Sequence, residues 1–280
     1  MKSIHSKLEV TLPPELGEKL DSAAARTGCS REDLVEQALR QFLYSEGVKN
    51  SVYLSAPINA LVEGFYVENT TIAEIKGQGD FGLGTFNYLD GEMVLLDGEV
   101  YQIRSDGMVY TVGEEEKSPF ACVTFFTPDT FDDLDGHFNF PDINAFLDRL
   151  IPSVNMLYAI RIDGEFRHVK TRAAPKSKNY LPLVEATKNQ AIFEFEHVKG
   201  SLAGFYTPPY MEHLNAPGYH LHFLTEDRRH GGHLIGCDLE KAHIGIQHVP
   251  ELRLSLPVTL DFLTADLSRD TRADLDKAEK

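Results

Sequence analysis

Hydrophobic and polar residues first alternate one by one in the segment KLEVTL, residues 7 to 12, which predicts a strand with one buried face. Two prolines end this pattern. From Pro14 onward apolar residues recur every four positions, which predicts a helix with Gly28 as its C-terminal cap. A second helix should begin at Ser30, where the sequence has the form of a capping box, and its apolar face continues to Leu43.

Residues 1 to 46 are therefore predicted to form a small unit of one strand and two helices. Such a unit cannot bury enough surface to be stable alone. We expect its strand to pair with the same strand of a second copy, which would make the protein a homodimer or a higher homo-oligomer.

After a short polar linker at residues 45 to 51, the pattern changes to many short β-rich runs. Runs such as EMVLL, EVYQI and MVYTV lie beside Asp-Gly pairs at positions 90–91, 97–98, 106–107 and 163–164, which predict hairpin turns. Helical patterns are limited to stretches such as INALVEGF and PDINAFLDRLI. Residues 51 to 280 are thus predicted to be an α+β domain of mainly antiparallel or mixed sheet in two β-rich halves.

Composition limits the class of protein. The chain has 280 residues, of which 42% are hydrophobic and 25% charged, as expected for a globular protein. The net charge of -16 repels nucleic acid and anionic membranes over most of the surface. The start MKSIHSKLEV has no apolar segment and no run of about 18 apolar residues follows, so neither a secretory signal nor a membrane span is expected. Three widely spaced cysteines also suit a reducing, cytoplasmic compartment.

Histidines cluster near the C-terminus, since seven of the eleven lie between positions 213 and 248. In GYHLHFL, His220 and His222 share one face of a predicted strand. The turn TEDRRHGG then brings the chain back, so that His233 can approach the same point. Three neutral imidazoles leave a coordination position open, as in catalytic zinc sites, although iron, copper, nickel and cobalt also accept this ligand set. The alternative is three histidines hydrogen-bonded separately on a polar sheet face.

A different metal site can be drawn from the same stretch. His220 and His222, followed by Glu226 and Gly232, also look like the first metal motif of the cupins. In that case Glu226 would be a ligand and His233 would not. The function would then be that of an oxygenase or a ligand-binding protein.

Longer motifs resemble the acetolactate decarboxylase family over about residues 51 to 280. They are FGLGTFNYLDGEMVLLDGEVYQI, SPFACVTFF, YAIRIDGEFRHVKTR and GYHLHFLTEDRRHGGH. The resemblance implies zinc bound by His220, His222 and His233. It also implies four further site residues, which are Thr85 of G-T-F, Glu92 of L-D-G-E, Arg172 of K-T-R and Glu279 in the tail. The tail itself, DLSRDTRADLDKAEK, is charged and lacks a continuous apolar face, which by itself is typical of a solvated chain end.

The activity implied by this resemblance is that of a carboxy-lyase, which converts 2-acetolactate to acetoin and carbon dioxide through a metal-chelated enediolate. The metal would stabilise the negative charge that remains when carbon dioxide leaves. Arg172 would orient the substrate carboxylate through two parallel hydrogen bonds. Glu92 is the first candidate for the acid that protonates the enediolate, and Glu279 is the second.

The N-terminal unit resembles the ribbon-helix-helix family in its order of strand, Pro-Pro, helix, G-x-S-R turn and helix. In that family the outward strand residues read DNA, and here these would be Lys7, Glu9 and Thr11. Residues 1 to 50 carry seven basic and eight acidic side chains. Because phosphate contacts supply most of the affinity for DNA, dimerisation is favoured over DNA binding through residues 1 to 44. A DNA-binding regulator with a metabolite-sensing domain remains a further alternative.

Overall fold

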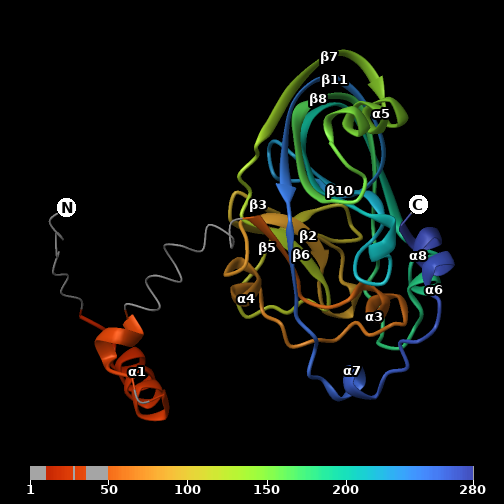
Figure 1. The fold of residues 1–280 in the computed structure, drawn as a ribbon. Coiled ribbons are helices and arrows are strands. Elements are labelled where there is room, and N and C mark those ends of the chain that lie inside the picture. Colours follow the sequence, from red (N-terminus) through yellow and green to blue (C-terminus); the bar gives the residue numbers. More distant parts are fainter. Residues whose placement is uncertain (1–10, 28, 36–49, 280) are drawn as a thin grey trace, which may run out of the picture. The chain divides into compact units, whose positions relative to one another are not determined.

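The computed structural model describes residues 11–27, 29–35 and 50–279, except for the side chains of Thr27 and Glu279. The chain divides into two compact units, Met1–Gly47 and Val48–Lys280 (Figure 1). No helix in the described ranges has the length and the apolar character that a bilayer crossing requires.

The first unit contains the two predicted helices as far as it is described. Helix α1 (Pro14–Thr27) begins at the predicted proline. Residues 31–35 are helical, and the expected capping box precedes them, because the backbone N–H of Asp33 donates to Ser30 Oγ at 3.0 Å and Ser30 Oγ donates to the Asp33 carboxylate at 2.7 Å. The Gly28 cap, most of the predicted strand and the end of the second helix lie outside the described residues.

The second unit is built on two sheets, and the predicted α+β class with two β-rich halves is confirmed. The first sheet has seven strands in the order β12-β1-β6-β2-β3-β4-β5, and only β1 and β12 run parallel. Its strands are β1 (Ser51–Leu54), β2 (Phe81–Thr85), β3 (Glu92–Leu96), β4 (Glu99–Ile103), β5 (Val109–Thr111), β6 (Ala121–Thr124) and β12 (Glu251–Leu254). Asp97 and Gly98, both at positive φ, form the predicted hairpin turn between β3 and β4.

The second sheet has five strands in the order β10-β9-β8-β11-β7, and β10 also pairs with β11, so that the sheet curls back on itself (Figure 1). Its strands are β7 (Thr130–Asn139), β8 (Leu157–Ala173), β9 (Ala191–Thr207), β10 (Gly218–Thr225) and β11 (Gly231–Val249). The turn predicted at Asp163-Gly164 is wrong, because both residues lie inside β8. A Cβ on Gly164 would meet the Lys241 carbonyl oxygen at 2.5 Å, so the glycine serves close strand packing rather than a turn.

Three apolar cores hold these layers together. The largest lies between the two sheets and includes Leu83 of one and Phe205 of the other. A second core joins the five-stranded sheet to α5 (Phe140–Leu150), which forms at the predicted helical stretch PDINAFLDRLI. A third core packs the outer face of the seven-stranded sheet on α4 (Ile72–Lys76). The helices of this unit are α3 (Ile58–Val62), α4 (Ile72–Lys76), α5 (Phe140–Leu150), α6 (Leu183–Ala186), α7 (Leu260–Thr264) and α8 (Arg272–Glu279), with 3-10 turns at Asn87–Leu89 and Pro209–Met211.

The C-terminal tail is not a solvated end. Its last eight described residues form α8, in which Leu275 and Ala278 are 2% and 3% exposed and belong to the core between the sheets. Most residues of this tail are charged, so the apolar pair Leu275 and Ala278 gives only a weak signal in the sequence. Their three-residue spacing places both on one face of the helix, and that face packs against the core.

Candidate functional site

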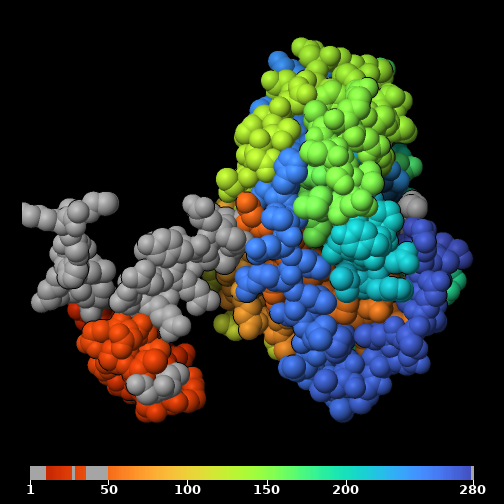
Figure 2. Space-filling model, viewed as in Figure 1, coloured from red at the N-terminus to blue at the C-terminus, as the bar shows by residue number. Residues whose placement is uncertain are grey.

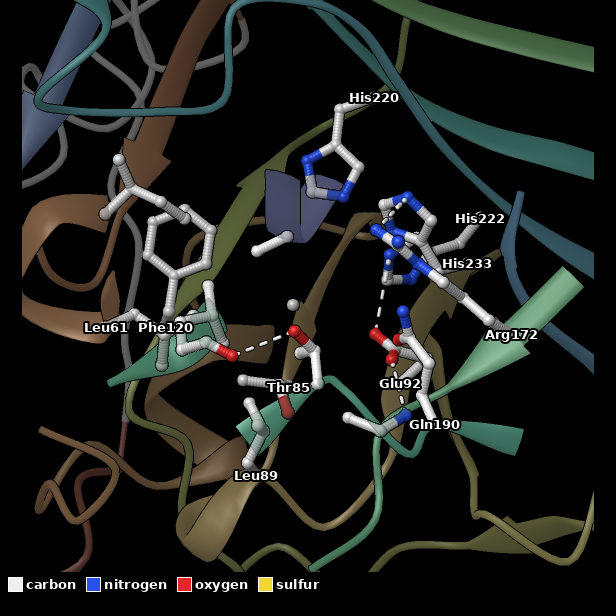
Figure 3. Close-up of a pocket in the computed structure, with 16 residues that line it drawn as sticks. Leu61, Thr85, Leu89, Glu92, Phe120, Arg172, Gln190, His220, His222 and His233 are labelled. Atoms are coloured by element: carbon white, nitrogen blue, oxygen red, sulfur yellow. Dashed lines mark hydrogen bonds and ion pairs between the residues drawn. The ribbon is translucent and has the colours of Figure 1, made fainter. Parts of the chain in front are cut away.

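The three predicted histidines converge on one side of a cavity (Figure 3). His222 of β10 lies opposite His233 of β11 in the strand pairing, and His220 lies two residues earlier on the same face. The ring centroids are 4.9 to 5.2 Å apart, and one nitrogen of each ring lies within 4.8 Å of the other two. All three are buried, and in the described part of the chain they form the one histidine, cysteine or carboxylate group compact enough to hold a metal.

Gly232 explains how His233 reaches this position. Its φ is +140°, and a Cβ there would lie 2.6 Å from the carbonyl oxygen of Arg172. Only glycine combines that backbone angle with so close an approach of β11 to β8. The Gly-Gly-His sequence therefore places the third imidazole opposite both Arg172 and His222.

The surroundings of His220 and His222 favour the neutral imidazole, which is the form that binds a metal. Burial, followed by the positive charge of Arg172, lowers the pKa of His220 to about 3. His222 Nδ1 lies 2.8 Å from the backbone carbonyl oxygen of Met93, so Nδ1 carries the proton and Nε2 faces the cluster. A carbonyl that fixes the outer nitrogen in this way is usual for metal-binding histidine. The donor set thus fits zinc or another imidazole-binding metal.

Glu92 and Arg172 approach the histidines from two different strands. Glu92 begins β3 in the seven-stranded sheet, where its Oε1 accepts a hydrogen bond of 3.0 Å from the Ala174 backbone N–H and its Oε2 lies 3.7 Å from His222 Nε2. Arg172, on β8, is 6% exposed and its Nη2 donates to His233 Nε2 at 3.0 Å. His233 Nε2 is therefore available to a metal only if the guanidinium turns away from it.

Thr85 borders the same cavity but its hydroxyl proton is already engaged. Its Oγ1 donates to the Gly91 carbonyl oxygen at 2.7 Å, and the residue pairs with Glu92 across β2 and β3. This contact holds the ends of the two strands together.

Most of the remaining cavity wall was not foreseen from the sequence. An apolar side is formed by residues of separate elements, with Gln190 near Glu92 on the opposite side (Figure 3). The apolar wall includes Ile58, Leu61, Leu89, Phe120, Leu183 and Ala278. No periodicity or motif joins these positions, so only the packing of the two sheets identifies them.

The two other carboxylates predicted for the site have different outcomes. The side chain of Glu279 lies outside the described residues, although Ala278 next to it lines the cavity. Glu226 is exposed in the turn after β10 and does not belong to the histidine group. The cupin-like ligand set is therefore wrong, because the strand pairing brings His233 rather than Glu226 to His220 and His222.

Comparisons with known proteins agree on the larger unit. Residues 52–269 match the family model of alpha-acetolactate decarboxylase. The chain is 42% identical to the alpha-acetolactate decarboxylase of Methanosarcina mazei over 237 residues, which are 84% of this chain and 82% of that relative. It is 41% identical to that of Bacillus subtilis strain 168, with 82% of this chain and 91% of the relative covered.

Solved structures give the same result for the fold. The crystal structure of the Bacillus subtilis enzyme aligns with a TM-score of 0.80 at 40% identity, covering 82% of this chain and 99% of that chain. A Staphylococcus aureus protein described as similar to alpha-acetolactate decarboxylase aligns with a TM-score of 0.79 at 26% identity. Residues 6–46 match the ribbon-helix-helix protein, copG family. The N-terminal segment thus matches a separate family. By its larger unit, the chain belongs to the alpha-acetolactate decarboxylase family of carboxy-lyases.

Proposed function

We propose that this protein decarboxylates 2-acetolactate to acetoin and carbon dioxide, with zinc held by His220, His222 and His233. The observation that carries this is the meeting of three buried imidazoles with Glu92 and Arg172 at one cavity. The relatives at about 40% identity carry the name of that activity over most of their length.

The substrate has a hydroxyl and a ketone on adjacent carbons, so both oxygens can bind one metal ion. Bound zinc would supply a Lewis acid for the negative charge that develops as carbon dioxide leaves. The buried position of the histidines keeps water away from that charge and strengthens its interaction with fixed dipoles.

Arg172 and Glu92 have two different proposed roles, which are substrate orientation and proton donation. The guanidinium can bind the substrate carboxylate with two parallel hydrogen bonds, once it has left His233, and so set the breaking bond perpendicular to the ketone plane. A grip that is equally tight before and during bond breaking would not raise turnover, so its contribution is orientation. Glu92, held at Oε1 by the Ala174 N–H, keeps Oε2 toward the cluster and is the proposed acid for the enediolate.

Thr85 keeps Glu92 in place through its bond to Gly91. Glu279 is the second proposed acid, since α8 brings its neighbour Ala278 to the cavity wall. Glu279→Gln should then lower turnover or the enantiomeric purity of the acetoin while metal content stays unchanged. Wild-type turnover together with wild-type stereochemistry would remove Glu279 from the site.

The experiment is to incubate purified full-length protein with racemic acetolactate and to follow acetoin and carbon dioxide, with and without a chelator. His220→Ala, His222→Ala and His233→Ala should each lose metal and activity, measured by elemental analysis and acetoin formation. Glu226→Gln is the matched control, because this carboxylate is exposed and lies in the adjoining turn. Activity that survives complete removal of metal would refute the zinc mechanism.

The N-terminal unit is proposed to pair with that of a second copy, as its ribbon-helix-helix match suggests. Deletion of residues 1–46 should leave the decarboxylase active but change its assembly, since the proposed site residues all lie beyond residue 84. Specific DNA complexes typically have Kd values of about 10 nM or tighter. Binding of that strength to a palindromic DNA at physiological salt would show that the unit serves DNA recognition instead.

A further inference from the structure

The turn at residues 86–91, which leads from β2 to Glu92 at the start of β3, has a strained backbone. Tyr88 and Leu89 have φ values of +66° and +54°, a left-handed conformation that is unfavourable for bulky residues. Gly91 also has a positive φ of +85°, and a Cβ at this position would collide with a carbonyl oxygen of β4. Such a backbone persists only where the surrounding structure holds it in place.

This turn positions two side chains of the cavity. Leu89 is 3% exposed and belongs to the apolar wall, and Glu92 follows the turn directly, with its Oε2 3.7 Å from His222 Nε2. Figure 3 shows Leu89 and Glu92 on the side of the cavity away from His220. A displacement of about 1 Å at a reacting group can lower a rate about 100-fold. The contacts that hold the turn therefore matter for the chemistry of the site.

Two side chains bind consecutive carbonyl groups of the turn. Thr85 Oγ1 donates to the Gly91 carbonyl oxygen at 2.7 Å, and Gln102 Nε2 donates to the Asp90 carbonyl oxygen at 2.6 Å. Thr85 borders the cavity, whereas Gln102 of β4 lies opposite Met93, which belongs to the core on the outer face of the sheet. Residues opposite one another in an antiparallel pair point to the same face. Gln102 therefore holds the turn from the side away from the cavity.

The burial of Gln102 indicates that its amide serves this bond. The side chain is 6% exposed, and a buried amide lowers stability unless it is hydrogen-bonded. An apolar side chain of similar size would pack against Met93 without that requirement. In Figure 2 the orange-to-gold segments, which form most of the seven-stranded sheet, show only in part between blue and cyan segments, in keeping with the low exposure of this sheet.

We propose that Gln102 is a positioning residue, which holds the Asp90 carbonyl group and thereby keeps Glu92 directed at the histidines. The inference rests on the proposed role of Glu92 as the acid. Two peptide units separate the Asp90 carbonyl group from the side chain of Glu92, so a shift of the turn is passed directly to the carboxylate. At the other end, the Ala174 N–H of β8 holds Glu92 Oε1 at 3.0 Å. Loss of the Gln102 bond should therefore loosen this second contact.

The first test is the variant Gln102→Leu, which removes the donor and keeps the approximate volume of the side chain. Its kcat should fall about 10- to 100-fold, whereas KM and metal content should stay within about twofold, because the histidines and Arg172 lie on other strands. Gln102→Arg keeps a donor, and the carboxylates of Asp90, Glu115 and Glu116 in the adjoining cavity offset its charge. This variant should keep kcat within about threefold of the wild type.

Thr124→Val is the matched control, because it removes another buried hydrogen bond of the same sheet. Thr124 Oγ1 donates to the Ser51 carbonyl oxygen at 2.9 Å, and the residue does not line the cavity. This variant should lower the melting temperature as Gln102→Leu does, with kcat unchanged. If Gln102 acts through Glu92, then Gln102→Leu added to Glu92→Gln should lower kcat by less than about twofold further.

A second measurement does not depend on the reaction. The Ala174 backbone N–H should exchange its hydrogen faster in Gln102→Leu than in the wild type or Gln102→Arg, as measured by NMR on the full chain, because its acceptor Glu92 Oε1 is displaced. Glu92→Ala gives the reference for complete loss of this acceptor. The Ile151 N–H, which donates to the Leu147 carbonyl oxygen at the end of α5, should exchange at the same rate in all variants.

The expected result is faster exchange at Ala174 together with a loss of kcat that requires Glu92. Unchanged exchange at Ala174 in Gln102→Leu would overturn the proposal, and so would an equally large loss of kcat in the Glu92→Gln background. A wild-type protein without decarboxylase activity would refute the proposed function instead. The exchange rate at Ala174 would then still decide whether Gln102 positions Glu92.

Discussion

The exchange Glu92→Gln tests the proposed site at its most informative side chain. Glutamine has the same shape, and its amide oxygen can still accept the hydrogen bond that the Ala174 N–H gives to Glu92 Oε1. The substitution removes the charge and the exchangeable proton of a carboxylate that is 12% exposed and lies 3.7 Å from His222 Nε2. The variant therefore separates proton transfer from packing.

The expected loss of turnover in Glu92→Gln can be estimated from the proposed role of Glu92 as a general acid. A positioned general acid contributes about 100- to 10,000-fold to a reaction rate. At about 1.4 kcal/mol for each tenfold change, this is about 3 to 5 kcal/mol of barrier height. If Glu92 acts only during proton transfer, kcat and kcat/KM should fall by the same factor. The melting temperature should change by only a few degrees, because the bond to Ala174 is kept.

The assay is steady-state acetoin formation, with metal content and thermal melting measured on the same preparation. Asp90→Asn is the control, since this carboxylate lies two residues away and only meets partly exposed cations, Lys176 at 3.4 Å and Arg104 at 3.9 Å. Partly exposed ion pairs contribute little, so its turnover should stay within about twofold. Retention of more than a tenth of wild-type turnover by Glu92→Gln, or a raised KM at unchanged kcat, would refute the role of Glu92 as the acid.

Two further predictions concern the elements around the site. Leu275→Ala should lower the free energy of unfolding by about 2 to 5 kcal/mol in denaturant titrations, because the side chain is 2% exposed, whereas the exposed Lys277→Ala on the same helix should change it little; equal effects would mean that α8 does not pack as described. Burial raises the pKa of Glu68 above its unfolded value, so the stability that this group contributes is present below the unfolded pKa, near about 4.3, and is lost as pH rises through the folded pKa. Glu68→Gln, which keeps an acceptor for Thr259, should therefore gain stability over the wild type as pH rises from 4 to 7, and a melting-temperature difference that shrinks over this range would contradict the reasoning.

The sequence by itself determined the elements whose signals are local. The helix from Pro14, the capping box at Ser30 and the hairpin turn at Asp97-Gly98 depend on neighbouring residues and appear where they were predicted. The His-x-His spacing fixed two imidazoles on one strand face, and a short return turn was enough to predict the third. Each of these features is decided by backbone angles or by a few adjacent side chains, so tertiary context had little to change.

Tertiary structure alone decided how distant segments meet. Glu92 approaches His222 across 130 positions because two separate sheets face one another, and motif resemblance named both residues without giving their contact. An Asp-Gly pair can form a hairpin turn or lie inside a strand. At Asp163-Gly164 the pair lies inside β8, because the close approach of β11 requires a glycine there.

The C-terminal part of the second unit shows most clearly why a sequence pattern does not determine burial. Leu275 was assigned to a charged tail and is buried, whereas Val258 and Leu260 are apolar and stand in solvent. Periodicity states which residues share a face, but it does not state what that face meets. What that face meets is set by the packing of the sheets against each other.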